Sequence, residues 1–194
     1  YKGEKATVQI GDNVTIREFC TVNKGTEAAM KTVVGDNTLL MAYTHIAHDC
    51  IIGKNCVLAN NANLAGHVEV GDYAVLGGAT NFQQFTKIGK HVIVSGGCLV
   101  NKDIPPFVRA ARHPTTYAGV NSIGLRRRGY STDQINLILD VYRILYIRGY
   151  NTTSALKIIE SEISSSPEKD EIVNFIRESV RGIMKGFKSS SDSD

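Results

Sequence analysis

Long apolar stretches are missing from this 194-residue sequence, and no segment is long or apolar enough to span a bilayer. No signal-peptide pattern opens the chain. The net charge of +3 is small, whereas most nucleic-acid-binding proteins present a concentrated basic face. We therefore expect a cytoplasmic protein with no transmembrane segment and no nucleic-acid partner.

An apolar residue stands at every sixth position from residue 34 to residue 100. A six-residue period fits neither an α-helix nor a flat strand, and it is typical of a hexapeptide-repeat parallel β-helix. The fifth place of each repeat is always small or slim, so we expect the first and fifth places to point inward. The first place is taken by Val34, Leu40, Ile46, Ile52, Leu58, Leu64, Val70, Leu76, Phe82, Ile88, Val94 and Val100.

A longer period of 18 residues lies on top of the hexads. An apolar residue, a glycine and a charged residue follow one another at 34–36, 52–54, 70–72 and 88–90. Three hexads therefore make one coil, which predicts a triangular prism whose coils rise by roughly 4.8 Å, the spacing of paired strands. Glycine at the second place suits a corner that needs positive φ or close backbone approach.

The first hexads keep the phase of the later ones but not their coil length. Ile10 and Ile16 fit the six-residue pattern, yet Gly11 lies 24 residues before Gly35, which is one coil plus six. We infer a loop excursion near residues 25–31, either functional or a tolerated insertion. The chain enters the pattern at once and without methionine, so we expect an uncapped first coil and further N-terminal coils in the natural protein.

All four cysteines stand at the small fifth place of a hexad, and none lies 18 residues from another. No cysteine is therefore stacked on a second one a coil away. We expect buried free thiols in a reducing cytoplasm rather than disulfides or metal ligands.

The hexads fail after residue 100, and the chain is expected to change its architecture there. We predict the β-helix at 1–106, a loop and linker at 107–130, three helices within 131–188, and a disordered tail at 189–194. The helices follow from a capping-box pattern, apolar residues at helical spacing and a proline at a first helical position. Their signals are Ser131 for the first helix, Thr153 to about Ile163 for the second, and Pro167 with the stripe Ile172, Ile176, Val180 and Ile183 for the third.

Histidines stand out among the aliphatic, small and amide residues of the repeats. Adding one coil takes His48 to Gly66 and Asp49 to His67, so each pair is expected to be adjacent across coils. A bare Gly66 leaves room for a substrate carbonyl, with a backbone N–H as oxyanion donor. Whether Asp49 also orients His48 stays open, because successive residues of a strand point to opposite faces.

His48 is the candidate general base, since imidazole titrates near neutrality; the alternative is an ordinary surface histidine. Three imidazoles, those of His45, His48 and His67, could instead converge on zinc. Steps of 18 residues, however, place Asn63 and then Asn81 beside His45 in the following coils. This ladder is either a polar stripe or a site for a polar ligand.

Arginines are concentrated where the repeats give way to the helices, at 126–128 together with Arg109 and Arg112. Guanidinium groups suit phosphate recognition. The alternative is a solvated charge run ahead of a helix.

Three segments together resemble one family: residues 45–50, residues 58–68, and residues 119–129. The chain resembles the acyl-ACP:UDP-N-acetylglucosamine O-acyltransferases of lipid A biosynthesis, within the hexapeptide-repeat acyltransferases, over essentially its whole length. The resemblance implies a left-handed parallel β-helix with a helical C-terminal domain. It also implies a homotrimer with active sites between subunits.

The family transfers a 3-hydroxyacyl chain from acyl carrier protein to the 3-hydroxyl of UDP-N-acetylglucosamine, the first step of lipid A biosynthesis, and needs neither metal nor cofactor. By resemblance, His48 is the general base, Asp49 its acidic neighbour and Gly66 the oxyanion donor. Gly96 matches a position that limits acyl-chain length. The substrate-binding positions matched are His45, His67, Gln84, Asn121, Arg127 and Arg128.

Two departures from the family pattern are visible, because Asn23 and Gln83 stand where members commonly carry histidine. Three other functions remain alternatives. They are a sibling N-acyltransferase acting on an amino-sugar nucleotide, a zinc-dependent β-helix resembling carbonic anhydrase, and a purely structural solenoid.

Overall fold

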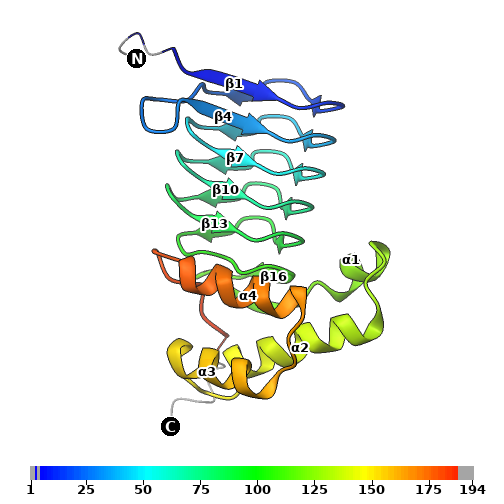
Figure 1. Cartoon of the computed structure of the whole chain (residues 1–194). Helices are drawn as coiled ribbons and strands as arrows, with labels where there is room; N and C mark the ends of the chain where they lie inside the picture. Colours follow the sequence, from blue (N-terminus) through cyan, green and yellow to red (C-terminus); the bar gives the residue numbers. More distant parts are fainter. Residues whose placement is uncertain (1–2, 4, 188–194) are drawn as a thin grey trace.

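The structure, a computed structural model, describes residues 3 and 5–187. A triangular parallel β-helix forms its first part, and helices follow at one end (Figure 1). Each coil gives one short strand to each of three sheets, here called A, B and C. The predicted fold class, a parallel β-helix of three hexads per coil followed by a helical domain, is confirmed.

The strands are mostly two residues long, as short faces of a prism require. Sheet A consists of β1 (Thr7–Ile10), β4 (Lys31–Val34), β7 (Ile51–Ile52), β10 (Glu69–Val70) and β13 (Lys87–Ile88). Sheet B consists of β2 (Thr15–Ile16), β5 (Leu39–Leu40), β8 (Val57–Leu58), β11 (Val75–Leu76), β14 (Ile93–Val94), β16 (Val108–Ala111) and β17 (Thr116–Val120). Sheet C consists of β3 (Thr21–Val22), β6 (His45–Ile46), β9 (Asn63–Leu64), β12 (Asn81–Phe82) and β15 (Leu99–Val100).

The interior of the prism holds the first and fifth places of the hexads, as predicted. Every first-place residue from Val34 to Val100 is at most 3% exposed. The fifth-place threonines satisfy their buried hydroxyls by donating to carbonyls, as Thr80 does to Gly77 at 2.8 Å. Each fully buried aliphatic side chain contributes roughly 1.5–3 kcal/mol relative to an exposed one. The first-place residues and the apolar fifth-place residues of the repeats therefore form the hydrophobic core of this domain.

The cysteines behave as expected from their place in the hexads. Cys50, Cys56 and Cys98 are buried and free, while Cys20 is half-buried. Burial raises the pKa of the Cys50 and Cys56 thiols to about 11. Neither thiol is therefore a nucleophile at neutral pH.

The corners of the prism are turned at the fourth place of each hexad. Asp49 and His67 have φ of 61° and 62°, and the other fourth places from Asn37 to Gly97 are left-handed too. The second-place glycines serve close approach instead, since a Cβ on Gly53 would lie 2.7 Å from the Asp72 nitrogen. Of the two reasons expected for glycine, close backbone approach is the one that applies.

The predicted excursion is present between β3 and β4. Thr7 of β1 pairs with Lys31 of β4, an offset of 24 residues, whereas later coils pair at 18. The extra residues form a loop on the edge between sheets C and A. Ile10 of the first coil is 43% exposed, while Val34, its counterpart one coil on, is fully buried.

The segment 107–130 is not only a loop and linker. β16 adds to sheet B by pairing in parallel with β14, β17 returns antiparallel to it, and α1 (Ser122–Arg127) follows. Ile93 pairs with Arg109 across 16 residues rather than 18, so the hexad pattern gave no sign of this extension.

Three longer helices, α2 (Thr132–Tyr146), α3 (Thr152–Glu162) and α4 (Pro167–Glu178), close this end of the β-helix (Figure 1). The capping box at Ser131 and the initial proline of α4 are confirmed. The last helix is shorter than predicted, because Val180 is 97% exposed and Ile183 forms a bridge with Asp103 of the β-helix end. The predicted apolar stripe therefore extends past the end of α4 into a segment that pairs with the end of the β-helix.

The expected tail at 189–194 lies outside the described residues. Within the described part of the chain, no helix has the length and apolar character needed to cross a membrane.

Candidate functional site

His48 and Asp49 lie on the edge between sheets C and A, in the turn from β6 to β7. Nδ1 of His48 is 2.9 Å from Oδ2 of Asp49. The left-handed φ of Asp49 breaks the alternation of a strand, so two successive side chains can meet. A carboxylate only accepts hydrogen bonds, so Nδ1 carries the hydrogen and Nε2 of the neutral ring keeps its lone pair.

The Asp49 carboxylate is buried and is held from two directions. The Thr26 N–H donates to Oδ1 at 2.8 Å, and the Thr26 hydroxyl donates to Oδ2 at 2.5 Å. Burial alone would raise the pKa of Asp49, but the bonds from Thr26 and His48 and the nearby His67 outweigh it and lower the pKa to about 2. Asp49 is therefore ionised at neutral pH. Its own N–H donates to the Thr32 hydroxyl at 2.9 Å.

Gly66 lies directly against the His48 ring, as the coil arithmetic predicted. A Cβ at residue 66 would lie 2.5 Å from Cε1 and 2.7 Å from Nε2 of His48. Any side chain here would displace the imidazole. Within residues 3 and 5–187, no acceptor takes the Gly66 N–H. A backbone N–H without an acceptor, on a residue that packs against the candidate base, is available as an oxyanion donor.

His67 is the expected neighbour of Asp49, with Nε2 3.7 Å from Oδ2. Its ring stacks on Phe85, with centroids 4.4 Å apart, and meets the His48 ring edge-on. The three side chains form one wall of this edge. We call the residues His48, Asp49, Gly66 and His67 the histidine edge.

His45 lies next to this edge, on the outer face of sheet C. Its register partners are Asn63 and, one coil further, Asn81, so the predicted polar ladder is confirmed. Nδ1 of His45 is 2.6 Å from the hydroxyl of Thr21, which orients the ring. A polar face thus continues from the histidine edge across sheet C.

Gln84 follows Gly66 by one coil on the same edge and is exposed. The two departures from the family pattern, Asn23 and Gln83, are also exposed here, in the coils before His48 and after Gly66. All three amide side chains are accessible to a ligand.

Asn121, Arg127 and Arg128 lie on a different edge, between sheets A and B. The buried Asn121 amide donates to the His91 carbonyl at 2.9 Å and accepts from Gly124 at 3.1 Å, which caps α1. The Arg128 guanidinium lies 5.1 Å from the centre of the Tyr73 ring. Both ends of the Asn121 amide are therefore occupied within the chain, whereas the side chains of Arg127 and Arg128 are exposed.

We call this second group, Tyr73, His91, Asn121, Arg127 and Arg128, the arginine edge. Its centre is the buried imidazole of His91, which stacks on Tyr73 with centroids 4.9 Å apart. Burial, Arg128 and Lys90 lower the pKa of His91 to about 4. His91 is therefore neutral at physiological pH, consistent with a structural role.

Gly96 lies on the third edge, between sheets B and C. A Cβ there would meet the Gly78 carbonyl at 3.1 Å, so larger residues crowd this edge. The predicted site residues of one chain are therefore distributed over all three edges. Sheet A separates the histidine edge from the arginine edge, and α1 lies on the side of the prism opposite the blue excursion loop (Figure 1).

One set of metal-compatible side chains lies on the histidine edge. Ligand atoms of His48, Asp49 and His67 all lie within 4.8 Å of one another. His45 is not part of this group in the described residues, so the three imidazoles do not converge as the zinc alternative required. Both Asp49 oxygens already accept hydrogen bonds, which favours orientation of the ring over metal ligation.

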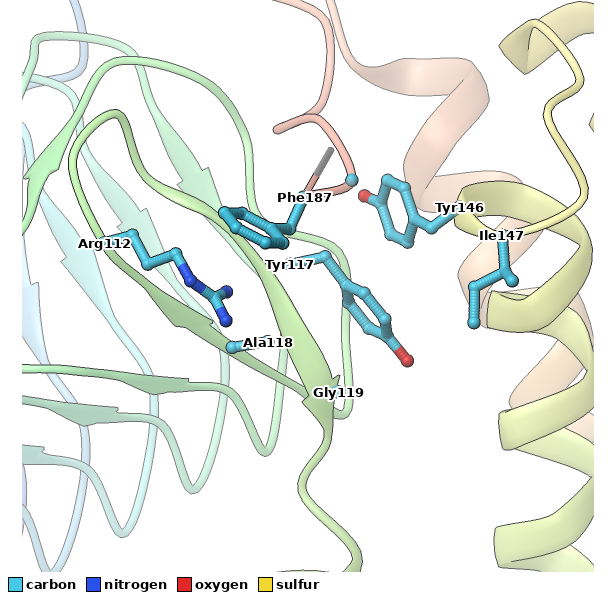
Figure 2. Close-up of a pocket in the computed structure, with 8 residues that line it drawn as sticks. Arg112, Tyr117, Ala118, Gly119, Tyr146, Ile147 and Phe187 are labelled. Atoms are coloured by element: carbon cyan, nitrogen blue, oxygen red, sulfur yellow. The ribbon is translucent and has the colours of Figure 1, made fainter. Parts of the chain in front are cut away.

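A hollow of about 260 Å³ lies elsewhere, between β17, the end of α2 and the segment at 186–187. Figure 2 shows the rings of Tyr117, Tyr146 and Phe187 beside it, with Arg112 near Phe187. Of the arginines grouped in the sequence, Arg112 lines this hollow, but no residue of the histidine edge or the arginine edge does. The chemistry of the histidine edge therefore lies on an open surface rather than in this hollow.

Sequence reasoning missed Thr26, Thr32 and Phe85. Thr26 and Thr32 hold Asp49, and Phe85 supports His67. The sequence held one indication of the contact with Thr26, because the 24-residue offset of the first coil places residue 25 beside Asp49 in the preceding coil. The path of the excursion itself could not be deduced from spacing.

Two family models match the chain. The model described as "UDP N-acetylglucosamine O-acyltransferase; Domain 2" matches residues 103–184, and "bacterial transferase hexapeptide (six repeats)" matches residues 31–66. The two matches correspond to the helical end with its hairpin and to part of the β-helix.

Curated relatives match nearly the whole chain. An acyl-[acyl-carrier-protein]–UDP-N-acetylglucosamine O-acyltransferase from Chlorobaculum parvum is 55% identical over 195 residues, covering 97% of this chain and 73% of the relative. One of the same name from Aquifex aeolicus is 54% identical, covering 97% of this chain and 72% of the relative. Among solved structures, a UDP-N-acetylglucosamine acyltransferase from Bacteroides fragilis superposes with a TM-score of 0.93 at 46% identity, covering 95% of this chain and 72% of its own.

Proposed function

Because the chain belongs to the acyl-[acyl-carrier-protein]–UDP-N-acetylglucosamine O-acyltransferase family, we propose that it transfers a 3-hydroxyacyl chain from acyl carrier protein to the 3-hydroxyl of UDP-N-acetylglucosamine, the first step of lipid A biosynthesis. The observation that carries the proposal is the hydrogen bond from His48 to Asp49 beside the bare Gly66. The four free cysteines fit a cytoplasmic location, which is part of the proposal.

In the proposed reaction, Nε2 of His48 takes the proton of the sugar hydroxyl as its oxygen attacks the thioester carbonyl. Asp49 holds the ring by Nδ1 and stabilises the imidazolium that forms. When the C–S bond breaks, His48 returns the proton to the leaving thiolate. General base catalysis of this kind contributes roughly 10² to 10⁴ in rate.

The tetrahedral intermediate carries its negative charge on the former carbonyl oxygen. The Gly66 N–H is the proposed donor, because Gly66 packs against the His48 ring and its N–H has no acceptor within the described residues. One such donor is worth roughly 3 kcal/mol in acyl transfer. The mechanism uses no covalent enzyme intermediate, metal or cofactor.

The sugar nucleotide is proposed to contact His45, His67 and Gln84 near the histidine edge, and Arg127 and Arg128 on the arginine edge. Asn121, predicted as a further contact, is buried and caps the helix that carries the two arginines. Sheet A separates these two edges within one chain. We propose that a site using both edges combines two copies of the chain. This geometry supports a homotrimer in which the edges of neighbouring subunits meet, as cyclic symmetry allows.

The acyl chain is proposed to run along the third edge of the prism, where Gly96 limits its length. Gly78 and Gly96 present no side chain at their places on this edge. A larger residue at position 96 would fill the path and shorten the preferred acyl chain.

The test is an assay with UDP-N-acetylglucosamine and 3-hydroxyacyl carrier proteins of several chain lengths, with the acylated sugar nucleotide followed by mass. We expect His48→Ala to abolish turnover, and Arg128→Ala mainly to raise KM for the sugar nucleotide. A fully active His48→Ala variant contradicts the assignment of the base.

The first alternative is a sibling acyltransferase that uses an amino-sugar nucleotide. A solved perosamine N-acetyltransferase variant from Caulobacter crescentus is 27% identical with a TM-score of 0.54, but it covers only 60% of this chain. The match of residues 103–184 to the O-acyltransferase model favours the O-acyl reading. Product with a 3-amino acceptor, and none with UDP-N-acetylglucosamine, would reverse this preference.

The second alternative is zinc chemistry at His48, Asp49 and His67, whose ligand atoms lie within 4.8 Å of one another. Metal analysis of the purified protein and an assay with a chelator distinguish the two. Our proposal expects acyl transfer that is unaffected by the chelator, whereas zinc catalysis requires its loss.

A further inference from the structure

In the excursion between β3 and β4, the side chain of Thr26 contacts the histidine edge. Its N–H and its hydroxyl each donate to a different oxygen of the Asp49 carboxylate, at 2.8 and 2.5 Å. Oδ2 also accepts from Nδ1 of His48 at 2.9 Å. Thr26 thus fixes both oxygens of the group that fixes the candidate base.

The direction of the Thr26 hydroxyl is itself determined by its neighbours. The Ala28 N–H donates to this hydroxyl oxygen at 3.3 Å, which leaves the hydroxyl hydrogen for Asp49. The Met30 N–H donates to the Thr26 carbonyl at 2.7 Å and closes the loop. Thr26 is therefore presented to Asp49 by a hydrogen-bonded turn rather than by a free loop.

The loop is also closed tightly at its base. Gly25 is buried, and a Cβ there would lie 2.2 Å from the Lys31 nitrogen. At the other end of the excursion, the Thr32 hydroxyl accepts from the Asp49 N–H at 2.9 Å. The two ends of the excursion hold the carboxylate and the backbone of the same residue.

We propose that Thr26 is a positioning residue for acyl transfer and that the six-residue lengthening of the first coil serves to place it. Thr26 touches neither His48 nor a reacting atom in this arrangement; it acts through Asp49. This inference rests on the proposed function and names a residue that contributes to its rate. Outer partners of this kind contribute roughly 10- to 100-fold to activity.

The test compares Thr26→Val, which keeps the shape and the N–H but loses the hydroxyl, with Thr26→Ser, which keeps both donors. Thr80→Val is the matched control, because Thr80 is a buried threonine whose hydroxyl donates only to the Gly77 carbonyl. We expect Thr26→Val to lower kcat by roughly 10- to 100-fold with KM for the sugar nucleotide within about twofold. Thr26→Ser is expected to restore kcat to near the wild-type value, and Thr80→Val to leave it unchanged.

A second measurement does not depend on activity. Carboxyl ¹³C NMR of the folded protein follows the titration of Asp49, which we expect to move to higher pH in Thr26→Val and to remain in place in Thr26→Ser and Thr80→Val. Wild-type kcat in Thr26→Val overturns the inference. If wild-type protein transfers no acyl group, the proposed function fails instead, and the Asp49 titration then decides whether Thr26 holds this carboxylate.

Discussion

Gly66 packs directly against the His48 ring, which is possible because glycine has no side chain. The space that a Cβ would take is 2.5 Å from Cε1 and 2.7 Å from Nε2 of the imidazole. The two residues are 18 positions apart, so one coil of the β-helix brings the bare backbone to the candidate base. The catalytic geometry is therefore as sensitive to residue 66 as to residue 48.

Gly66→Ala is expected to reduce kcat by at least 10²-fold, since the methyl group displaces the imidazole and misaligns the oxyanion donor. Gly78→Ala is the control for folding only, because Gly78 occupies the same place of its hexad and its Cβ would meet the Asn60 carbonyl at 3.3 Å. Circular dichroism of both variants shows whether the β-helix accepts the added methyl group, and steady-state kinetics of Gly66→Ala against wild type checks the loss of kcat. A folded Gly66→Ala variant with wild-type kcat would contradict the proposed position of His48.

Asp49→Asn is expected to change acid stability in a defined window. The folded pKa of Asp49 is lowered from 3.8 to about 2, so its stabilising contribution is complete above pH 4 and is lost as pH falls toward 2. The amount is on the order of 2 kcal/mol. The stability gap between wild type and Asp49→Asn should therefore shrink between pH 5 and pH 2.5, as measured by thermal unfolding. A constant gap would show that Asp49 is not held as a carboxylate.

His91→Phe is expected to make the free energy of unfolding less dependent on pH in a different pH range, between 6.5 and 4. The folded pKa of His91 is lowered from 6.5 to about 4, so the folded state disfavours the proton that the unfolded chain binds. Wild type should lose up to about 3 kcal/mol as pH falls from 6.5 to 4. His91→Phe keeps a ring between Tyr73 and Phe107 without this loss, whereas His113→Gln, on an exposed turn, should behave like wild type. Parallel profiles for wild type and His91→Phe would refute the assignment.

Mixing two impaired variants tests whether the site lies between subunits. His48→Ala and Arg128→Ala subunits, unfolded together and refolded, should form some sites with both side chains intact. With random assembly of equal amounts, roughly a quarter of the sites regain full function, because each edge is intact half of the time. Activity equal to the average of the two separate variants would place the whole site within one chain.

The hexad pattern was sufficient to predict the β-helix, its three sheets, its buried places and even the meeting of Gly66 with His48. A solenoid allows this because each coil contacts mainly its neighbours, so a fixed offset in sequence becomes a fixed distance in space. The same logic located the excursion from a single break in the 18-residue period. The N-cap of α2 at Ser131 and the start of α4 at Pro167 were predictable for a similar reason, since the contacts at a helix start are local.

Other parts of the site followed from contacts that no period encodes. The approach of Thr26 to Asp49, the addition of β16 and β17 to sheet B, and the return of Ile183 to Asp103 each depend on the path of an irregular segment. The hydrogen bond between His48 and Asp49 depends on one left-handed residue at a corner. The sequence by itself determined the repeating scaffold and the order of residues along each edge, and only the tertiary structure decided which side chains turn toward one another, because loop paths and corner torsions are set by packing rather than by spacing.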